Sequence, residues 1–333
     1  MALATVYLVA FACLTFCTYS ITWLGEYGAL ALATLTYGLF AASALVTGNV
    51  AALVLVAAVW GWGASVLWTA GTAFALDLAE AGDYGRAAGT LYTGVYVGQA
   101  LGVVLLGVLV GLLGPHGMAA CAAGLTLLGS AVALCLPRGR HARARPTLLN
   151  PLAVLASPTT RTAALVLLLS SSGFGLLLGV FGQVAAALYG LAAVGWVTAG
   201  FYVARIPAGS GGGRLIDRLG RRPILCTAFL ASASSLLLAA GLHQPALLVV
   251  CAAALGVQAA VVPVGLTTWV GDRARTEDRP HTYAAVALWS NMGTGLAILG
   301  GHALVSVLGG WRGSLTFFAV IFLACAGLAA RLD

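Results

Sequence analysis

The sequence is 333 residues long, 61% hydrophobic and only 8% charged, with a formal net charge of +7. This composition excludes a soluble globular protein. Apolar stretches of about 20 residues follow one another, which indicates a chain that crosses a bilayer as helices. A transmembrane β-barrel is excluded, because its strands would alternate apolar and polar residues over about 10 positions.

Breaks in the apolar pattern predict five spans in the first part of the chain. These spans cover residues 2–23, 28–47, 51–76, 88–113 and 117–136. The first one is not a signal peptide, because no cation precedes it and further apolar segments follow. We expect residues 1–137 to form an N-terminal helical bundle.

A basic stretch at residues 138–161 separates the first spans from the rest of the chain. It contains five arginines, at Arg138, Arg140, Arg143, Arg145 and Arg161, with prolines among them. Such a composition cannot build a packed core, so we expect a solvated linker.

Six further spans are predicted after this linker. They cover residues 162–188, 191–212, 223–242, 246–271, 282–308 and 313–331. We expect residues 162–333 to form a C-terminal six-helix bundle. The predicted fold is an all-α membrane protein of two bundles with about eleven transmembrane helices.

The two parts of the chain repeat at a constant offset of 195 residues. Single matches mean little in a chain rich in Ala, Gly and Leu, but one offset aligns every break between spans. Duplicated halves are typical of transporters. Equivalent pairs include Gly25 and Gly220, Gly61 and Gly256, Asp77 and Asp272, Gly98 and Gly293, and Gly114 and Gly309.

The same offset leaves one helix of the second part without a counterpart. The partner of the span at residues 162–188 would begin before Met1. We therefore expect the first half to lack its first helix, either because the start site is placed too late or because the helix has been lost.

The cysteines and the enzyme motifs give no sign of a metal or catalytic centre. All 7 cysteines fall inside apolar runs without metal-type spacing, which favours small core residues. No zinc-protease motif, nucleotide-binding Gly-Lys-Ser/Thr loop or intramembrane Asp pair is found. We expect no enzyme activity, no cofactor, no bound metal and no nucleic-acid partner.

The arginines predict the orientation of the chain. If the linker is cytoplasmic, all but two of the 16 cations lie in loops or ends on that side. The exceptions are Arg312, on the outer side, and Arg205, within a span. We expect a multi-pass protein of the cell membrane with a cytoplasmic linker.

Residues 212–223 read GGRLIDRLGRRP and lie between the spans at residues 191–212 and 223–242. This stretch resembles the signature G-x-L-x-D-R-x-G-R-R of the major facilitator superfamily (MFS). We expect a cytoplasmic gating loop in which the Asp accepts from amides at a helix start. The motif residues are Gly213, Asp217, Arg218, Gly220, Arg221 and Arg222.

The resemblance implies two bundles that rock about a site near the middle of the membrane. The spans then correspond to helices 2–6 and 7–12 of a twelve-helix fold, and the motif lies between helices 8 and 9. In the first half only Trp23, Leu24 and Gly25 echo the motif, and Thr22 stands where the Asp is expected. A symmetrical gate is therefore not expected.

Arg205 is the only cation at membrane depth, where an unpaired charge costs several kcal/mol. Its partner is an anionic substrate, a carboxylate on the absent helix, or a structural group such as Asp77, a tyrosine hydroxyl or a carbonyl. Snorkelling to the inner interface is a further alternative.

Polar residues at equivalent positions of the two halves suggest a shared water-lined face. Interhelical hydrogen bonds that hold the bundle together are the alternative interpretation. The candidate cavity residues are Arg205, Tyr202, Gln258, Gln183, Ser171, Thr72, Tyr96, Gln99, Asn291 and Thr294.

Together these features predict a secondary-active transporter that moves a small solute by alternating access, with a coupling ion such as H⁺. The rival interpretation is a non-transporting membrane scaffold or sensor derived from such a transporter. The absent helix and the degenerate first-half motif favour this rival.

Overall fold

The structure is a computed structural model that describes residues 2–46, 49–80, 82–136, 146, 148–242 and 244–332. Its helices in the first part of the chain are α1 (Ala2–Leu14), α2 (Cys17–Leu24), α3 (Glu26–Val46), α4 (Val50–Asp77) and α5 (Tyr84–Leu134). The later elements are α6 (Pro151–Ala156), α7 (Pro158–Leu176), the π-helical turn η1 (Leu177–Phe181), α8 (Gly182–Tyr189), α9 (Leu191–Leu219), α10 (Arg221–Gly241), α11 (Pro245–Arg273), the 3-10 turn η2 (Thr276–Asp278), α12 (Arg279–Val307) and α13 (Trp311–Ala329).

Each of the eleven predicted spans corresponds to helix in the structure. Among the described residues, eight helical segments are long and apolar enough to cross a membrane, or nine if the bent pair α1 and α2 is one span. The helices α3 and α9, with 21 and 29 residues, account for the other two predicted spans. The all-α membrane fold is confirmed.

The first span is bent by 75° between α1 and α2. The bend lies at Thr15 and Phe16, where neither Gly nor Pro signals it in the sequence. A bend leaves backbone carbonyls without helical partners. Leu149, far along the chain, donates its backbone N–H to the carbonyl of Thr15 at 2.8 Å. A contact between segments far apart in the sequence therefore satisfies one carbonyl at the bend.

The motif at residues 212–223 is helical rather than a loop, and this corrects the prediction. α9 continues to Leu219 and α10 begins at Arg221, so Gly220 alone connects them, with φ 82°. Glycine adopts this left-handed conformation without the steric cost of a Cβ. A one-residue connection makes the motif a rigid corner.

The basic part of the linker, residues 137–145, lies outside the described residues. The end of the linker contains the short helix α6, capped by Asn150, whose side chain accepts from the backbone N–H of Leu152 at 3.0 Å. Leu149 and Val154 are buried in a cluster with residues of both halves of the chain. This end of the linker is packed against the protein.

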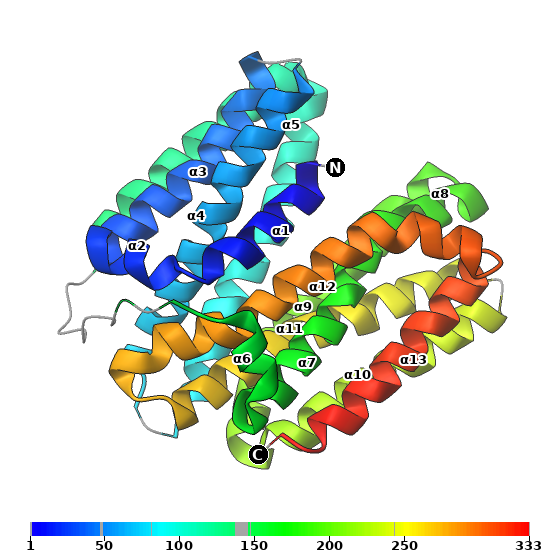
Figure 1. The fold of residues 1–333 in the computed structure, drawn as a ribbon. Helices are drawn as coiled ribbons and strands as arrows, with labels where there is room; N and C mark the ends of the chain where they lie inside the picture. The colour runs from blue at the N-terminus through cyan, green and yellow to red at the C-terminus, as the bar shows by residue number, and fades with distance from the viewer. Residues whose placement is uncertain are drawn as a thin grey trace.

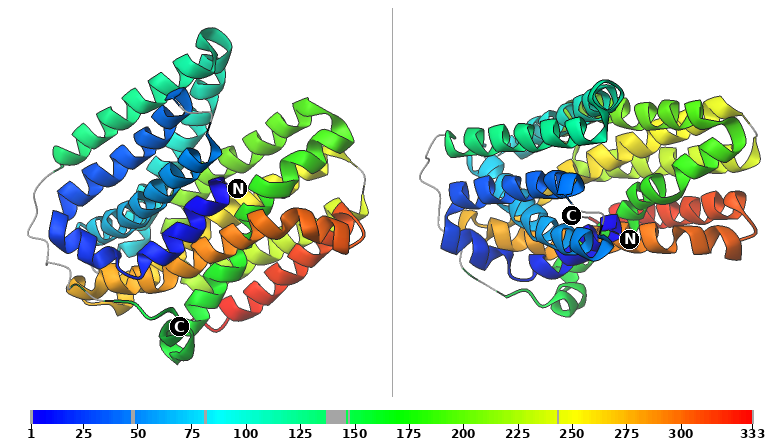
Figure 2. Two further views of the ribbon diagram at one scale, coloured as in Figure 1. Left: turned by 45° about the horizontal axis from the view of Figure 1, so that its top comes forward. Right: turned by 90° about the horizontal axis from the view of Figure 1, so that it is seen from above.

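The helices form two bundles, α1–α5 and α7–α13 (Figures 1 and 2). Across their interface α1 packs on α12, and α5 packs on α9. The offset of 195 residues maps α1 onto α9 and α5 onto α12, so the interface is made twice by equivalent helices. In Figure 1 the bundles lie close at the end that carries α2 and the start of α12, and they diverge toward the end that carries α8.

Backbone conformations confirm the repeat. Gly25 and Gly220 precede equivalent helices with φ of 70° and 82°. Gly114 and Gly309 have φ of 70° and 72°. Each pair is related by the offset, and each position favours glycine because its φ is positive.

Packing between helices repeats in the same way. A Cβ added at Gly61 would lie 2.6 Å from the carbonyl oxygen of Val6. A Cβ at the equivalent Gly256 would collide with the carbonyl oxygen of Phe201, and Val6 and Phe201 are themselves equivalent. The contact of α4 with α1 is therefore that of α11 with α9.

Candidate functional site

A cavity of about 1130 Å³ lies between the two bundles. This volume lies slightly above the range of about 300–1,000 Å³ that is usual for small-molecule sites. Its lining is mostly apolar and aromatic and includes Tyr37, Trp60, Trp68 and Phe74 from the first half. The second half contributes residues of α7, α9, α11 and α12.

Arg205 of α9 lines this cavity and is only 7% exposed. Its Nη1 donates to Oε1 of Gln99, on α5 of the other half, at 2.8 Å. Its guanidinium lies 4.0 Å from the ring centroid of Tyr96, within the range of a cation–π contact. Tyr96 and Gln99, about one turn apart on α5, thus contact the guanidinium of Arg205.

Three more aromatic rings surround the Arg205 guanidinium. The centroids of Phe201, Phe174 and Tyr202 lie 5.2, 5.7 and 5.8 Å from its Cζ atom. Of these three, Tyr202 alone was predicted from the sequence. The phenylalanines were missed because one apolar residue among many gives no signal before its neighbours are known.

Arg205 has no carboxylate partner among the described residues. The predicted structural alternative, Asp77, is wrong, because Asp77 pairs with Arg279 at 2.8 Å. The Nε atom of Arg205 is buried and has no hydrogen-bond partner within the described ranges. The positive charge is held by rings and by one neutral amide, and nothing described compensates it.

Six of the predicted residues line the cavity together: Arg205, Thr72, Tyr96, Gln99, Asn291 and Thr294. The hydroxyl of Thr72 is buried and has no hydrogen-bond partner among the described residues. Thr294 instead donates to the carbonyl of Ser171 at 3.2 Å, which joins α12 to α7. The lining therefore combines polar groups that face the cavity with groups used in packing.

The other four predicted residues do not line the cavity. Gln183 lies on the exposed surface of α8, and Tyr202 is only half-buried beside Arg205. The Ser171 hydroxyl bonds back to the carbonyl of Leu168 in its own helix. Gln258 is 2% exposed, and its Oε1 has no partner in the described part of the chain. These four side chains lie outside the cavity lining, whereas the first six lie within it.

Hydroxyl groups from both halves meet at one end of the cavity. The hydroxyl of Tyr92 lies 3.4 Å from that of Tyr283 and 3.4 Å from that of Thr267. Tyr92 and Tyr283 also line the cavity. Tyr92 comes from α5, whereas its two partners come from α12 and α11, so this cluster joins the halves.

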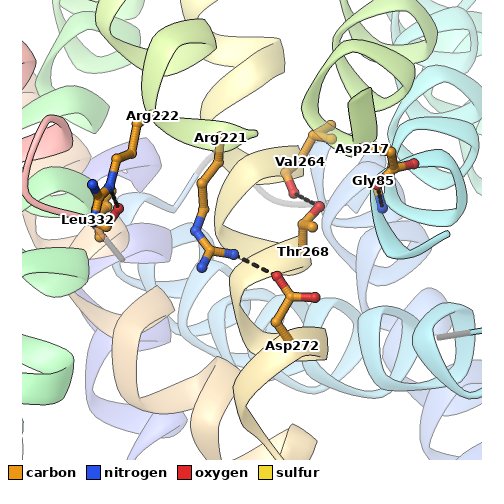
Figure 3. A network of polar contacts seen from close by, with 8 residues as sticks. All are labelled: Gly85, Asp217, Arg221, Arg222, Val264, Thr268, Asp272 and Leu332. Atoms are coloured by element: carbon orange, nitrogen blue, oxygen red, sulfur yellow. Dashed lines mark hydrogen bonds and ion pairs between the residues drawn. The ribbon is translucent and has the colours of Figure 1, made fainter. Parts of the chain in front are cut away.

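Asp217 joins the halves beyond this cluster. Its carboxylate accepts from the backbone N–H of Gly85 at 2.8 Å, at the start of α5 (Figure 3). It also accepts from the backbone N–H of Arg86 at 2.8 Å. This confirms the expectation that Asp217 accepts from amides at a helix start. Burial raises the pKa of Asp217, although these two N–H groups oppose the shift. A Cβ at Gly85 would meet both Asp217 and Gly213, so only glycine allows this approach.

Arg279 makes the second polar junction between the halves. Its Nη1 donates to Asp77 at 2.8 Å and to the carbonyl of Leu76 at 3.1 Å, and its Nη2 donates to the hydroxyl of Tyr84 at 2.7 Å. Arg279 is one of the cations that the arginine pattern assigns to loops or ends on the cytoplasmic side. In the structure Arg279 is the first residue of α12 and only 7% exposed, so it is a buried contact and not a solvated loop cation.

The remaining basic residues of the motif act within the second half. Arg221 donates to Asp272 at 2.6 Å, and the backbone carbonyl of Leu332 accepts from Arg222 (Figure 3). Arg218 and Gly220 lie in the exposed corner. Asp217 of the motif, by contrast, makes two hydrogen bonds that cross between the halves.

Nothing in the described ranges groups three or more His, Cys, Asp or Glu side chains as a metal site. The chemistry that the cavity offers is binding, with one cation, a few amides and hydroxyls, and aromatic walls.

Comparison with known proteins identifies a family that matches both halves of the chain. A family model described as Major Facilitator Superfamily matches residues 1–162 and again residues 163–332. A search of curated protein sequences finds no match.

Solved structures are similar in fold. The human organic anion transporter MFSD10 (TETRAN) superposes with a TM-score of 0.83 at 17% identity, over 98% of this chain and 82% of that one. The E. coli fucose:proton symporter FucP, as a variant, gives 0.76 at 15% identity, over 100% and 92% of the two chains. FucP in the outward conformation gives 0.77 at 14% identity, over 100% and 89%. At these identities the likeness concerns the fold.

Proposed function

The chain belongs to the Major Facilitator Superfamily, and from this premise we propose that it is a secondary-active transporter that moves a small organic anion by alternating access. As a multi-pass membrane protein of a transporter family, it has the architecture that such a mechanism needs. The negative charge of the solute is a more specific inference than transport. It rests on Arg205.

The uncompensated charge of Arg205 is the observation that supports an anionic solute. A buried guanidinium without a carboxylate is costly in a membrane protein, and an anion that binds it removes this cost. Gln99 occupies Nη1, and Nε has no partner among the described residues. The aromatic walls of the cavity suit an apolar body attached to the acid group.

Alternating access requires contacts between the halves that can open. We propose that the contacts of Asp217 with Gly85 and of Arg279 with Asp77 close one end of the cavity in this state. The excess of arginines near that end makes it the cytoplasmic end by the positive-inside rule, with the linker on the same side. The cavity would then receive solute from outside.

A coupling ion such as H⁺ is part of the proposal. FucP is described as a proton symporter, and it shares this fold. No cavity-lining residue among those described is a carboxylate, so a coupling proton would have to use the solute or another group.

The test uses three solutes of similar shape and different charge: benzoate, benzyl alcohol and benzylamine. With purified protein, we expect benzoate alone to raise the melting temperature, because a ligand stabilises the state that binds it. Arg205→Gln should abolish this shift. Arg312→Gln, which removes a charge outside the cavity, should keep it.

Uptake into proteoliposomes then separates transport from sensing. Entry of labelled benzoate that depends on Arg205 supports the transporter, and a pH gradient that changes its rate supports proton coupling. Binding without uptake would favour the sensor alternative. An equal response to all three solutes, or an unchanged response in Arg205→Gln, would overturn the anion proposal.

A further inference from the structure

Tyr96 of α5 makes two different contacts with the other half of the chain. Its ring centroid lies 4.0 Å from the guanidinium of Arg205 on α9. Its hydroxyl donates to the backbone carbonyls of Ala259 and Ala260 on α11, at 3.4 and 3.3 Å. The Tyr96 side chain is only 1% exposed. One buried residue of the first half therefore connects the cation of the cavity with the backbone of a second helix.

Pro263 explains why α11 offers a carbonyl at this level. A proline has no backbone N–H, so position 263 cannot donate to the carbonyl of Ala259, four residues earlier in the helix. Within a membrane, a carbonyl freed in this way needs a donor from a neighbouring group. The Tyr96 hydroxyl is such a donor. Prolines are also the usual places where helices kink, so Pro263 is a point at which α11 can bend.

The part of α11 before Pro263 packs within the second half. A Cβ added at Gly256 would collide with the carbonyl oxygen of Phe201 on α9. Because this contact is with backbone, it leaves little room for movement between the two helices. The outer part of α11 is therefore fixed to its own bundle.

The part of α11 after Pro263 faces the first half. The hydroxyl of Thr267 lies 3.4 Å from that of Tyr92 on α5, and a Cβ added at Gly271 would lie 3.1 Å from the Leu76 side chain of α4. The Leu76 carbonyl also accepts from Arg279 at 3.1 Å. This part of α11 thus belongs to the end of the cavity that we propose to be closed.

The repeat does not reproduce the pair of Tyr96 and Pro263. The offset of 195 residues maps Tyr96 onto Asn291 and Pro263 onto Trp68. Asn291 donates to the carbonyl of Ala287 in its own helix, at 3.5 Å. Trp68 keeps its backbone N–H, so α4 needs no extra donor at that level. The proline and the tyrosine that compensates for it therefore occur together, in one of the two equivalent places.

We infer that Tyr96 is a positioning residue, which couples a solute at Arg205 to bending of α11 at Pro263. An anion that binds the guanidinium draws it away from the face of the ring. When the ring shifts, its hydroxyl leaves Ala259, and the inner part of α11 is free to move away from α5. The coupling rests on the proposed function, because the anion starts this sequence of movements.

A double-mutant cycle tests the pair of Tyr96 and Pro263 without any solute. Tyr96→Phe keeps the ring beside Arg205 but leaves the Ala259 carbonyl without this donor. We expect the melting temperature in detergent to fall by about 2 to 4 °C. Pro263→Ala supplies the missing backbone N–H. In its background Tyr96→Phe should lower the melting temperature less than half as much.

Tyr92→Phe is the matched control for this cycle. Tyr92 lies one turn from Tyr96 on α5, and its hydroxyl meets the hydroxyls of Thr267 and Tyr283 rather than a backbone carbonyl. Its effect on the melting temperature should be the same with and without Pro263→Ala. Additive effects of Tyr96→Phe and Pro263→Ala, or equal coupling of both tyrosines to Pro263→Ala, would overturn the pair.

A cysteine reporter tests the coupling, which a merely structural role of Tyr96 would not affect. Thr267→Cys in a cysteine-free background places a thiol just after Pro263, at a position that is 0% exposed. In inverted membrane vesicles, benzoate should raise the rate at which an impermeant maleimide labels this thiol by about threefold or more. The rise should disappear in Tyr96→Phe. Benzoate should still raise the melting temperature of that variant, because the ring and the guanidinium remain.

The outcomes separate this inference from the anion proposal. A rise in labelling that survives Tyr96→Phe, or no rise in a parent that binds benzoate, would overturn the coupling. A parent that benzoate does not stabilise would overturn the anion proposal together with the coupling that rests on it. The thermal cycle would still decide whether Tyr96 and Pro263 act as a pair.

Discussion

Arg279 at the start of α12 and Asp77 at the end of α4 form an ion pair between the two halves, with both side chains only 8% exposed. The repeat does not reproduce this pair. Asp272, the equivalent of Asp77, pairs with Arg221 inside its own half. Position 26, the equivalent of Arg221, is Glu26, which cannot pair with a carboxylate. Asp77 is therefore available for the contact between the halves.

We predict that Asp77→Asn destabilises the protein by about 3 to 5 kcal/mol, because it leaves the Arg279 guanidinium buried without its counter-charge. Asp272→Asn is the matched control. Asp272 has a 43% exposed side chain, so its loss should cost less than about 1 kcal/mol. Thermal unfolding in detergent compares the two. Equal losses would contradict the assignment of Arg279 and Asp77 as the buried junction.

Gln99→Glu should place a carboxylate where the amide oxygen now lies, 2.8 Å from Nη1 of Arg205. We expect the variant to keep or raise the melting temperature, because the buried cation gains a partner. It should lose benzoate binding by at least tenfold, because the charge that attracts the anion is neutralised. Unchanged benzoate binding would show that the anion does not use Arg205.

Gly61→Ala and Gly256→Ala should both destabilise the protein, each by about 1 to 3 kcal/mol, because the added Cβ meets a backbone carbonyl of the neighbouring helix. Gly211→Ala in α9 has no atom within 4 Å and serves as the control. It should be neutral or stabilise by up to about 1 kcal/mol, since alanine favours helix. The melting temperatures of the three variants are compared. A loss at only one of Gly61 and Gly256 would show that the two equivalent contacts are not equally close.

Asp217→Ala should weaken the closed end of the cavity, because the N–H groups of Gly85 and Arg86 lose their acceptor. Loss of such a cap costs about 1 kcal/mol. Asp217→Asn should be milder, because its amide oxygen still accepts one bond and burial already raises the pKa of the carboxyl group. In a cysteine-free background, a Thr72→Cys reporter should react faster with a soluble maleimide in Asp217→Ala than in Asp217→Asn. Equal rates in the two variants and the parent would rule out a closing role.

Much of the fold was predictable from local sequence. The spans follow from runs of apolar residues, and their ends follow from glycines such as Gly114 and Gly220, whose positive φ the sequence announces by residue type. The repeat and the motif led to the family and to the acceptor role of Asp217. The bend at Thr15 was not predictable, because it is stabilised by Leu149 from the end of the linker.

Local sequence alone established that this chain spans a membrane, that it is built of two related halves, and that Arg205 is an anomaly at membrane depth. The spans and the cost of Arg205 follow from transfer free energies to lipid, to which each residue contributes separately. The two halves follow from residues that match at a constant offset. The three-dimensional packing was needed to show that Asp77 pairs with Arg279 and that Gln99 and four rings surround Arg205. Those facts depend on which side of each helix meets which neighbour, and that is set by contacts between segments far apart in the sequence.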